Sequence, residues 1–76
     1  MTTKKTVELN NIENQFEKDI LLFLKERGEC IYGEIIKDLQ MSSARGQEAI
    51  YSLISQGYVK HLNKTSRLKL NIDLKE

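Results

Sequence analysis

The chain has 76 residues, with 12 Lys and Arg against 11 Asp and Glu, so its net charge is +1. This length fits one domain over residues 1–76 with a small core, which leaves little volume for a deep substrate pocket and argues against an enzyme. A single cysteine excludes an internal disulfide and a multi-cysteine zinc site, and no apolar run reaches the ~20 residues of a membrane span. We expect a cytoplasmic protein that needs no cofactor or metal and does not enter a membrane.

An N-terminal arm, residues 1–11, precedes the first helix. Apolar and polar residues alternate over residues 6–9, which indicates a short, half-buried strand. Asn14, followed three residues later by Glu17, resembles a capping box and marks the start of the helix. Gly28 can end the helix in the left-handed conformation. The apolar stripe of this helix consists of Phe16, Ile20, Phe23 and Leu24.

Residues 31–57 predict a helix-turn-helix. The junction between the two helices is sharp, because only Gln40 and Met41 separate them. Ser42 or Ser43 can cap the helix after the junction, and Gly33 lies where the helix before it begins and can cap that one. With the preceding helix, these two complete a core over residues 12–57. Apolar residues recur at helical spacing, namely Ile31, Ile35, Ile36 and Leu39, then Gly46, Ile50, Leu53 and Ile54.

Two small residues of this core need an explanation. Cys30 lies in a connector, residues 29–31, that can form a single bridge in a sheet, and we expect it to be buried. It is a poor candidate nucleophile, because no histidine or acid lies in a supporting motif. Gly46 lies inside the third helix, where glycine costs about 0.5–1 kcal/mol relative to alanine. A close approach of the second helix, or room for Tyr32 or Phe23, would account for it.

After Gly57 the periodicity changes from helical to alternating. Residues 58–62 and 67–74 predict two strands, joined by a turn at residues 63–66, so residues 58–76 form a hairpin and C-terminal strand. The far end of the longer strand needs a neighbour to cover its apolar side and pair its edge. The segment with Val7 and Leu9 is the candidate, and it can come from the same chain or from a second copy. One face of the strand carries Leu68, Leu70, Ile72 and Leu74.

Charge is distributed unevenly along the chain. Residues 1–41 carry six bases and eight acids, a balance of −2, and residues 70–76 contribute −1. Residues 42–69 carry five bases and one acid, Glu48, a balance of +4. Such an asymmetry often marks a side that faces a polyanion, and otherwise it is ordinary solvated surface. The five bases are Arg45, Lys60, Lys64, Arg67 and Lys69.

The order of helix, short strand, helix, turn, helix and two-stranded hairpin resembles the α+β winged-helix domain. The string SSARGQEAIYSLISQGYV is similar to the recognition helix of small MarR-like and ArsR-like regulators and to the step from it into the wing. The resemblance covers about residues 16–71. It implies a double-stranded DNA partner, a homodimer, a third helix in the major groove, and a wing on the backbone or in the minor groove.

The predicted DNA contacts follow from that docking mode. With Ile50 as the centre of the buried face, Arg45, Glu48, Ser52 and Ser55 point outward, and Ala44 and Tyr51 lie toward the flank. Arg45 could then read guanine, Gln47 adenine, and Ser43 a phosphate. The expected DNA-binding residues are Ser42, Ser43, Ala44, Arg45, Gln47, Glu48, Tyr51, Lys60, Lys64, Arg67 and Lys69.

A narrower resemblance is to winged-helix domains that bind left-handed Z-form nucleic acid. Those domains carry an asparagine and a tyrosine four residues apart on the third helix, followed by Ser-Leu. Gln47, Tyr51, Ser52 and Leu53 are similar. The chain departs from that pattern at Ser43, where those domains have a lysine, and in a hairpin without their Pro-Pro-Trp motif.

The sequence favours a small transcriptional regulator that reads double-stranded DNA. Glu48 argues against tight binding, because a carboxylate on the reading face repels phosphate. The alternative is a winged helix that binds another protein and has no DNA affinity, through a neutral face of Tyr51, Ser52, Ser55 and Glu48.

Overall fold

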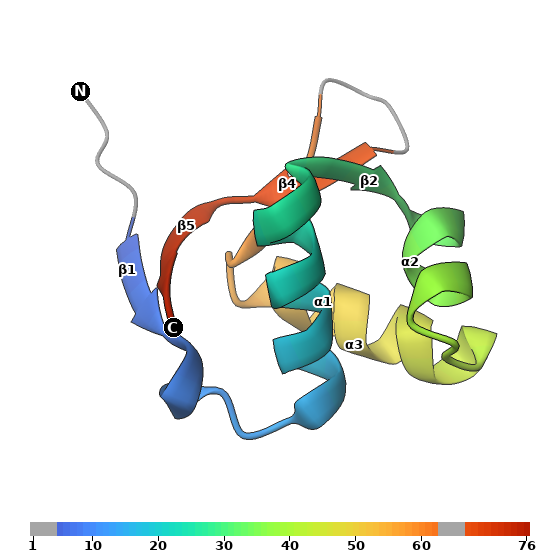
Figure 1. Ribbon diagram of the computed structural model, residues 1–76, viewed down its shortest axis with the longest axis horizontal. Coiled ribbons are helices and arrows are strands. Elements are labelled where there is room, and N and C mark those ends of the chain that lie inside the picture. Colours follow the sequence, from blue (N-terminus) through green and yellow to red (C-terminus); the bar gives the residue numbers. More distant parts are fainter. Residues whose placement is uncertain (1–4, 63–66) are drawn as a thin grey trace.

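The computed structural model describes residues 5–62 and 67–76, so the predicted turn and Lys64 lie outside the described residues. Figure 1 shows three helices beside short strands, in the predicted α+β winged-helix order. The helices are α1 (Gln15–Arg27), α2 (Tyr32–Asp38) and α3 (Ser43–Ser55), with a 3-10 turn, η1, at Leu9–Asn11. The strands are β1 (Lys5–Glu8), β2 (Glu29–Ile31), β3 (Val59–His61), β4 (Arg67–Leu70) and β5 (Ile72–Lys75).

Side-chain caps start two of the helices where the sequence predicts them. The Oδ1 atom of Asn14 accepts hydrogen bonds from the backbone N–H of Phe16 at 2.8 Å and of Glu17 at 3.2 Å. The hydroxyl of Ser42 accepts from the N–H of Arg45 at 3.3 Å, so Ser42 and not Ser43 caps α3. These bonds satisfy amides that would otherwise lack a partner in the first turn.

The second helix begins earlier than predicted. Tyr32 is its first residue and Ile31 its N-cap, so the prediction that Gly33 caps the helix is wrong. The N–H of Ile31 donates to Oε1 of Glu34 at 3.4 Å, so the side chain of a first-turn residue caps the start of α2. At the other helix ends, Gly28 and Gly57 have positive φ angles of 89° and 83°, a conformation that glycine adopts without steric cost.

The strands form two sheets that meet at Asn71. One sheet has the order β2-β4-β3 and is antiparallel, and the other pairs β1 with β5 in parallel. The predicted strand over residues 67–74 is therefore two strands. The backbone N–H of Asn71 donates to the carbonyl of Tyr58 at 2.8 Å, and its side-chain amide donates to the carbonyl of Gly57 at 3.1 Å. These bonds hold the chain at the bend that sends β5 away from the hairpin.

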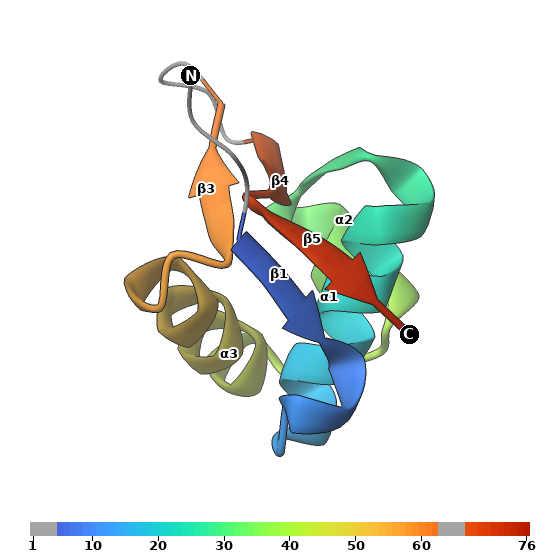
Figure 2. The ribbon, with the colours of Figure 1, turned by 90° about the vertical axis from the view of Figure 1, so that its left-hand side faces the viewer.

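The partner of β5 comes from the same chain. Lys5 to Glu8 pair in register with Ile72 to Lys75, and Figure 2 shows β1 and β5 side by side. The segment with Val7 therefore pairs with the last strand within one chain, which answers the question that the sequence left open. This pairing also removes one reason to expect a dimer, because the end of the last strand is paired without a second copy.

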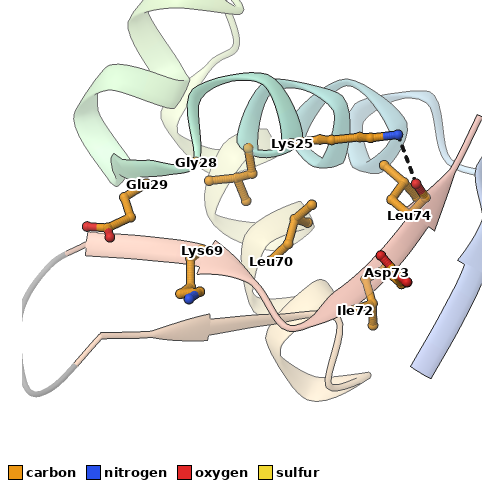
Figure 3. A pocket seen from close by; sticks show the side chains of 9 residues that line it. Lys25, Gly28, Glu29, Lys69, Leu70, Ile72, Asp73 and Leu74 are labelled. Carbon is orange, nitrogen blue, oxygen red and sulfur yellow. Dashed lines mark hydrogen bonds between the residues drawn. The ribbon is translucent and has the colours of Figure 1, made fainter. Parts of the chain in front are cut away.

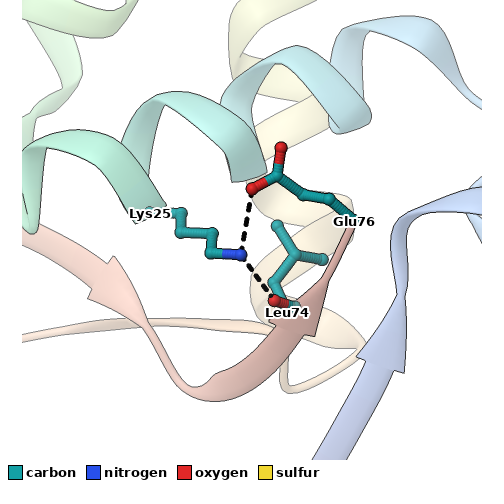
Figure 4. Close-up of polar contacts among 3 residues, drawn as sticks. All are labelled: Lys25, Leu74 and Glu76. Carbon is teal, nitrogen blue, oxygen red and sulfur yellow. Dashed lines mark hydrogen bonds and ion pairs between the residues drawn. The ribbon is translucent and has the colours of Figure 1, made fainter.

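A lysine of α1 fastens the two-stranded sheet to the helical core. The ammonium group of Lys25 donates to the backbone carbonyl of Leu74 at 2.9 Å and lies 3.0 Å from a carboxylate oxygen of Glu76 (Figure 4). Beneath it the core is continuous, since β1, β5, the three-stranded sheet and all three helices contribute buried side chains. The largest fully buried residues are Ile20, Leu21, Leu24, Ile35, Leu53, Leu68 and Cys30.

Gly46 is the point of closest approach between α2 and α3. A Cβ atom placed on it would collide with Cδ1 of Ile36 and lie 3.2 Å from Cγ1 of the same side chain. The hydroxyl of Tyr32 would be 3.8 Å away. The packing reason for this glycine is therefore a close approach of the second helix, as the sequence suggested.

We expect Gly46→Ala to lower the free energy of unfolding by about 1 kcal/mol, because overpacking outweighs the gain in helix propensity. In an Ile36→Val background, which lacks the colliding Cδ1 atom, the same change should be neutral or stabilising. Urea denaturation of the four proteins measures this coupling. An equal effect of Gly46→Ala in both backgrounds would contradict the proposed contact.

Cys30 is buried in β2, and burial raises the pKa of its thiol, with the Glu34 carboxylate acting in the same direction. At pH 8 the folded protein should therefore hold this group as an inaccessible thiol. Iodoacetamide should alkylate it far more slowly in buffer than in denaturant. Equal rates in the two conditions would show that the thiol is exposed.

Candidate nucleic-acid interface

The exposed side of α3 is turned relative to the predicted orientation. Gly46, Ala49, Ile50 and Leu53 are buried, so the centre of the buried face lies away from Ile50 toward the two small residues. Tyr51, expected at the flank, is 64% exposed. At 100° per residue, the side opposite the buried one carries Ala44, Glu48, Tyr51 and Ser55, flanked by Gln47. We call these five residues the outward face of α3.

Arg45 does not lie on that face. The central carbon of its guanidinium group is 5.8 Å from the centre of the Phe16 ring, at the start of α1. A shallow hollow of about 90 Å³ lies between the two helices at this point. Its lining residues are Asn14, Phe16, Glu17, Arg45, Glu48, Ala49 and Ser52. Arg45 and Ser52 thus face α1, and the structure separates Arg45 from Gln47 and Tyr51.

Phe16 is the neighbour that sequence reasoning missed. Its place in the apolar stripe of α1 predicts a buried core residue, yet it is 37% exposed beneath Arg45. A cation over an aromatic ring at an exposed site contributes roughly 0.5–1 kcal/mol, which is enough to favour one position of a mobile arginine. The pairing joins residues from different helices, so spacing along the chain gave no signal for it.

The amino end of α3 is exposed and is held in place by α2. Ser42, Ser43 and Ala44 are all exposed. The hydroxyl of Tyr32 donates to the backbone carbonyl of Ser43 at 2.9 Å, and Gln40 in the preceding turn has a positive φ of 53°. This end of the helix therefore presents small hydroxyl and methyl groups on a backbone fixed by its neighbour.

The described cations of the hairpin include a like-charged pair. Lys60 of β3 lies directly opposite Lys69 of β4, and Lys69 lies opposite Glu29 of β2 on its other side. Lys60 and Arg67 are exposed and Lys69 is half-buried. Like charges directly opposite each other destabilise an antiparallel pair, and only part of this cost is offset by Glu29. An anion above the two ammonium groups would remove the repulsion.

A larger cavity borders the hairpin at Lys69. It has a volume of about 290 Å³ and lies where β4 and β5 pass the end of α1 (Figure 3). Its lining includes two cations, Lys25 and Lys69, and two acids, Glu29 and Asp73. The apolar lining residues are Leu24, Leu70, Ile72 and Leu74. Within residues 5–62 and 67–76, no group of three metal-ligating side chains occurs, and no helix is long and apolar enough to cross a membrane.

Comparison with known proteins identifies the fold. No family model and no curated protein matches the sequence. Among solved structures, the chain is similar to the Zalpha domain of PKZ from Carassius auratus, crystallised in complex with Z-DNA. The TM-score is 0.67 at 24% identity, over 74% of this chain and 92% of that chain. The chain therefore has the winged-helix fold.

The opposed lysines give a stability prediction. We expect Lys60→Glu to raise the free energy of unfolding by about 0.5 kcal/mol, because it places opposite charges across from each other, and to raise the melting temperature by about 2–4 °C. The double variant Lys60→Glu/Lys69→Glu restores like charges and should lose the gain. Thermal denaturation at low salt measures both, and a single variant less stable than the native protein would contradict the register argument.

Proposed function

We propose that this protein binds double-stranded nucleic acid, with the outward face of α3 against the duplex and the hairpin cations on its phosphates. The observation that carries the proposal is the exposure of Tyr51 beside Gln47 on the outward face. The opposed Lys60 and Lys69 lie on the hairpin, which follows α3 after three residues, 56–58, and lower stability unless they meet an anion. In support, a solved structure that is similar to this chain is a complex with Z-DNA.

Within that function, we propose that the left-handed duplex is the preferred form. The outward face holds no cation, and Arg45 is directed toward Phe16, so the face is suited to contact shape and apolar surface more than phosphate. The pattern Gln47, Tyr51, Ser52 and Leu53 resembles that of Z-form binders. The similar Zalpha domain was crystallised in complex with Z-DNA. Ser43 and the hairpin still depart from the pattern, which predicts a modest affinity.

The second candidate is a sequence-reading transcriptional regulator with α3 in the major groove. Gln47 favours it, because an exposed amide on the outward face can bond adenine at two atoms. Lys64 belongs to both models as a phosphate contact at the predicted turn. A homodimer remains a prediction for the regulator, since half-site recognition would use two copies. If neither duplex binds, the alternative function is that of a winged helix that binds another protein.

The test compares an alternating CG duplex with a scrambled duplex of the same composition. We expect the protein to convert the alternating duplex to the left-handed form, read as an inverted circular dichroism spectrum, and to bind the scrambled duplex more weakly. Tyr51→Ala should reduce conversion at least about fivefold, since stacking and apolar contacts of one aromatic side chain are worth roughly 1–3 kcal/mol. Tyr51→Phe keeps the ring and should retain most of the activity.

The same experiment separates the alternatives. Because Tyr51 is largely exposed, Tyr51→Ala should change the unfolding free energy by less than about 0.5 kcal/mol, which excludes misfolding as the cause. Binding without inversion, and with a preference for one right-handed sequence, would favour the regulator. No affinity for either duplex at low salt, or affinity that does not fall as salt rises, would refute nucleic-acid binding.

A further inference from the structure

Tyr32 of α2 brings a hydroxyl group to the first turn of α3. The side chain is half-buried, and its hydroxyl donates to the carbonyl of Ser43, an exposed residue, at 2.9 Å. The same hydroxyl would lie 3.8 Å from a Cβ atom on Gly46. The close approach of the two helices at this glycine therefore lets a residue of α2 reach the exposed amino end of α3.

The bond from Tyr32 is an additional one for the carbonyl that accepts it. Ser43 is the first residue of α3, so the regular helical pattern already gives its carbonyl the backbone N–H of Gln47. The hydroxyl can then turn to another acceptor without leaving a backbone group unpaired. A phosphate oxygen is a better acceptor, because a hydrogen bond to an ionised group is roughly twice as strong as a neutral one.

We infer that Tyr32 is a further nucleic-acid-binding residue, whose hydroxyl donates to a phosphate of the bound duplex. The inference rests on the proposed function. Ser43, Gln47 and Tyr51 follow one another at intervals of one helical turn, so the Tyr32 hydroxyl lies at the head of a line of exposed side chains. Arg45, the one cation of α3, is directed toward Phe16 instead.

An uncharged donor on the α2 side of α3 thus supplies a phosphate contact that the cation of this helix does not. The spacing of residues along α3 gave no signal for it, because Tyr32 lies eleven residues before Ser43 and on another helix. Such a contact positions the helix on the backbone and carries no sequence information, so it should serve every duplex that the outward face accepts.

The first test is Tyr32→Phe, which removes the hydroxyl and keeps the ring. We expect the affinities for the alternating and the scrambled duplex to fall by similar factors, about three- to tenfold, as for the loss of one hydrogen bond. The dependence of affinity on salt should stay unchanged, since a neutral hydroxyl displaces no counterion. The matched control is Tyr58→Phe, the same change at a half-buried tyrosine beside β3, which should leave both affinities nearly unchanged.

A second variant, Ser43→Lys, separates a phosphate contact from a purely structural role of Tyr32. A lysine at residue 43 places a cation beside the same phosphate, so it should raise affinity and steepen the salt dependence by about one counterion. If Tyr32 bonds that phosphate, the gain should be larger in the Tyr32→Phe background than in the native one. If Tyr32 only steadies α3, the gain should be equal in both.

Three results would overturn the inference, given that the native protein binds. They are equal gains from Ser43→Lys in the two backgrounds, a weaker salt dependence in Tyr32→Phe, and a loss from Tyr32→Phe no greater than that from Tyr58→Phe. Absence of native binding to either duplex refutes the proposed function itself.

Discussion

The contact between Ile36 of α2 and the bare backbone of Gly46 in α3 is the constraint on which the functional face depends. Two helices approach closely only where one of them lacks a side chain, and here the missing Cβ allows α3 to lie with Gly46 and Ala49 against its neighbours. That position sets the rotation of α3 about its own axis. Because the rotation is fixed, Tyr51 points to solvent and Arg45 points to α1.

The remaining structure holds this face steady. Lys25 joins α1 to the carbonyl of Leu74, and β1 closes the edge of β5 within the same chain. Two hydrogen bonds join the bend at Asn71 to the carbonyls of Gly57 and Tyr58, the residues between α3 and β3. The opposed Lys60 and Lys69 lie on the hairpin that follows this bend. The features proposed to bind nucleic acid are an exposed aromatic ring, Tyr51, and a pair of like charges across two strands.

Sequence patterns were reliable where the cause is local. The caps at Asn14 and Ser42 and the helix end at Gly28 depend on groups within a few residues of each other, and each was predictable. The rotation of α3 does not follow from its large apolar residues. Centring the buried face on Ile50 misplaces it, because the smallest residues, Gly46 and Ala49, also lie against neighbours. The split of the last strand and the cation over Phe16 depend on partners distant along the chain. No periodicity encodes such pairs.

A nuclear magnetic resonance titration tests the interface most directly. Backbone amide signals of the protein would be followed while an alternating CG duplex is added at low salt. We expect the largest shifts at Gln47, Glu48 and Tyr51 of α3 and at Lys60 of β3, with small changes in β1 and β5. Saturable shifts concentrated at the cavity between α1 and β5, or none at all, would contradict the claim that the outward face of α3 and the hairpin form the nucleic-acid surface.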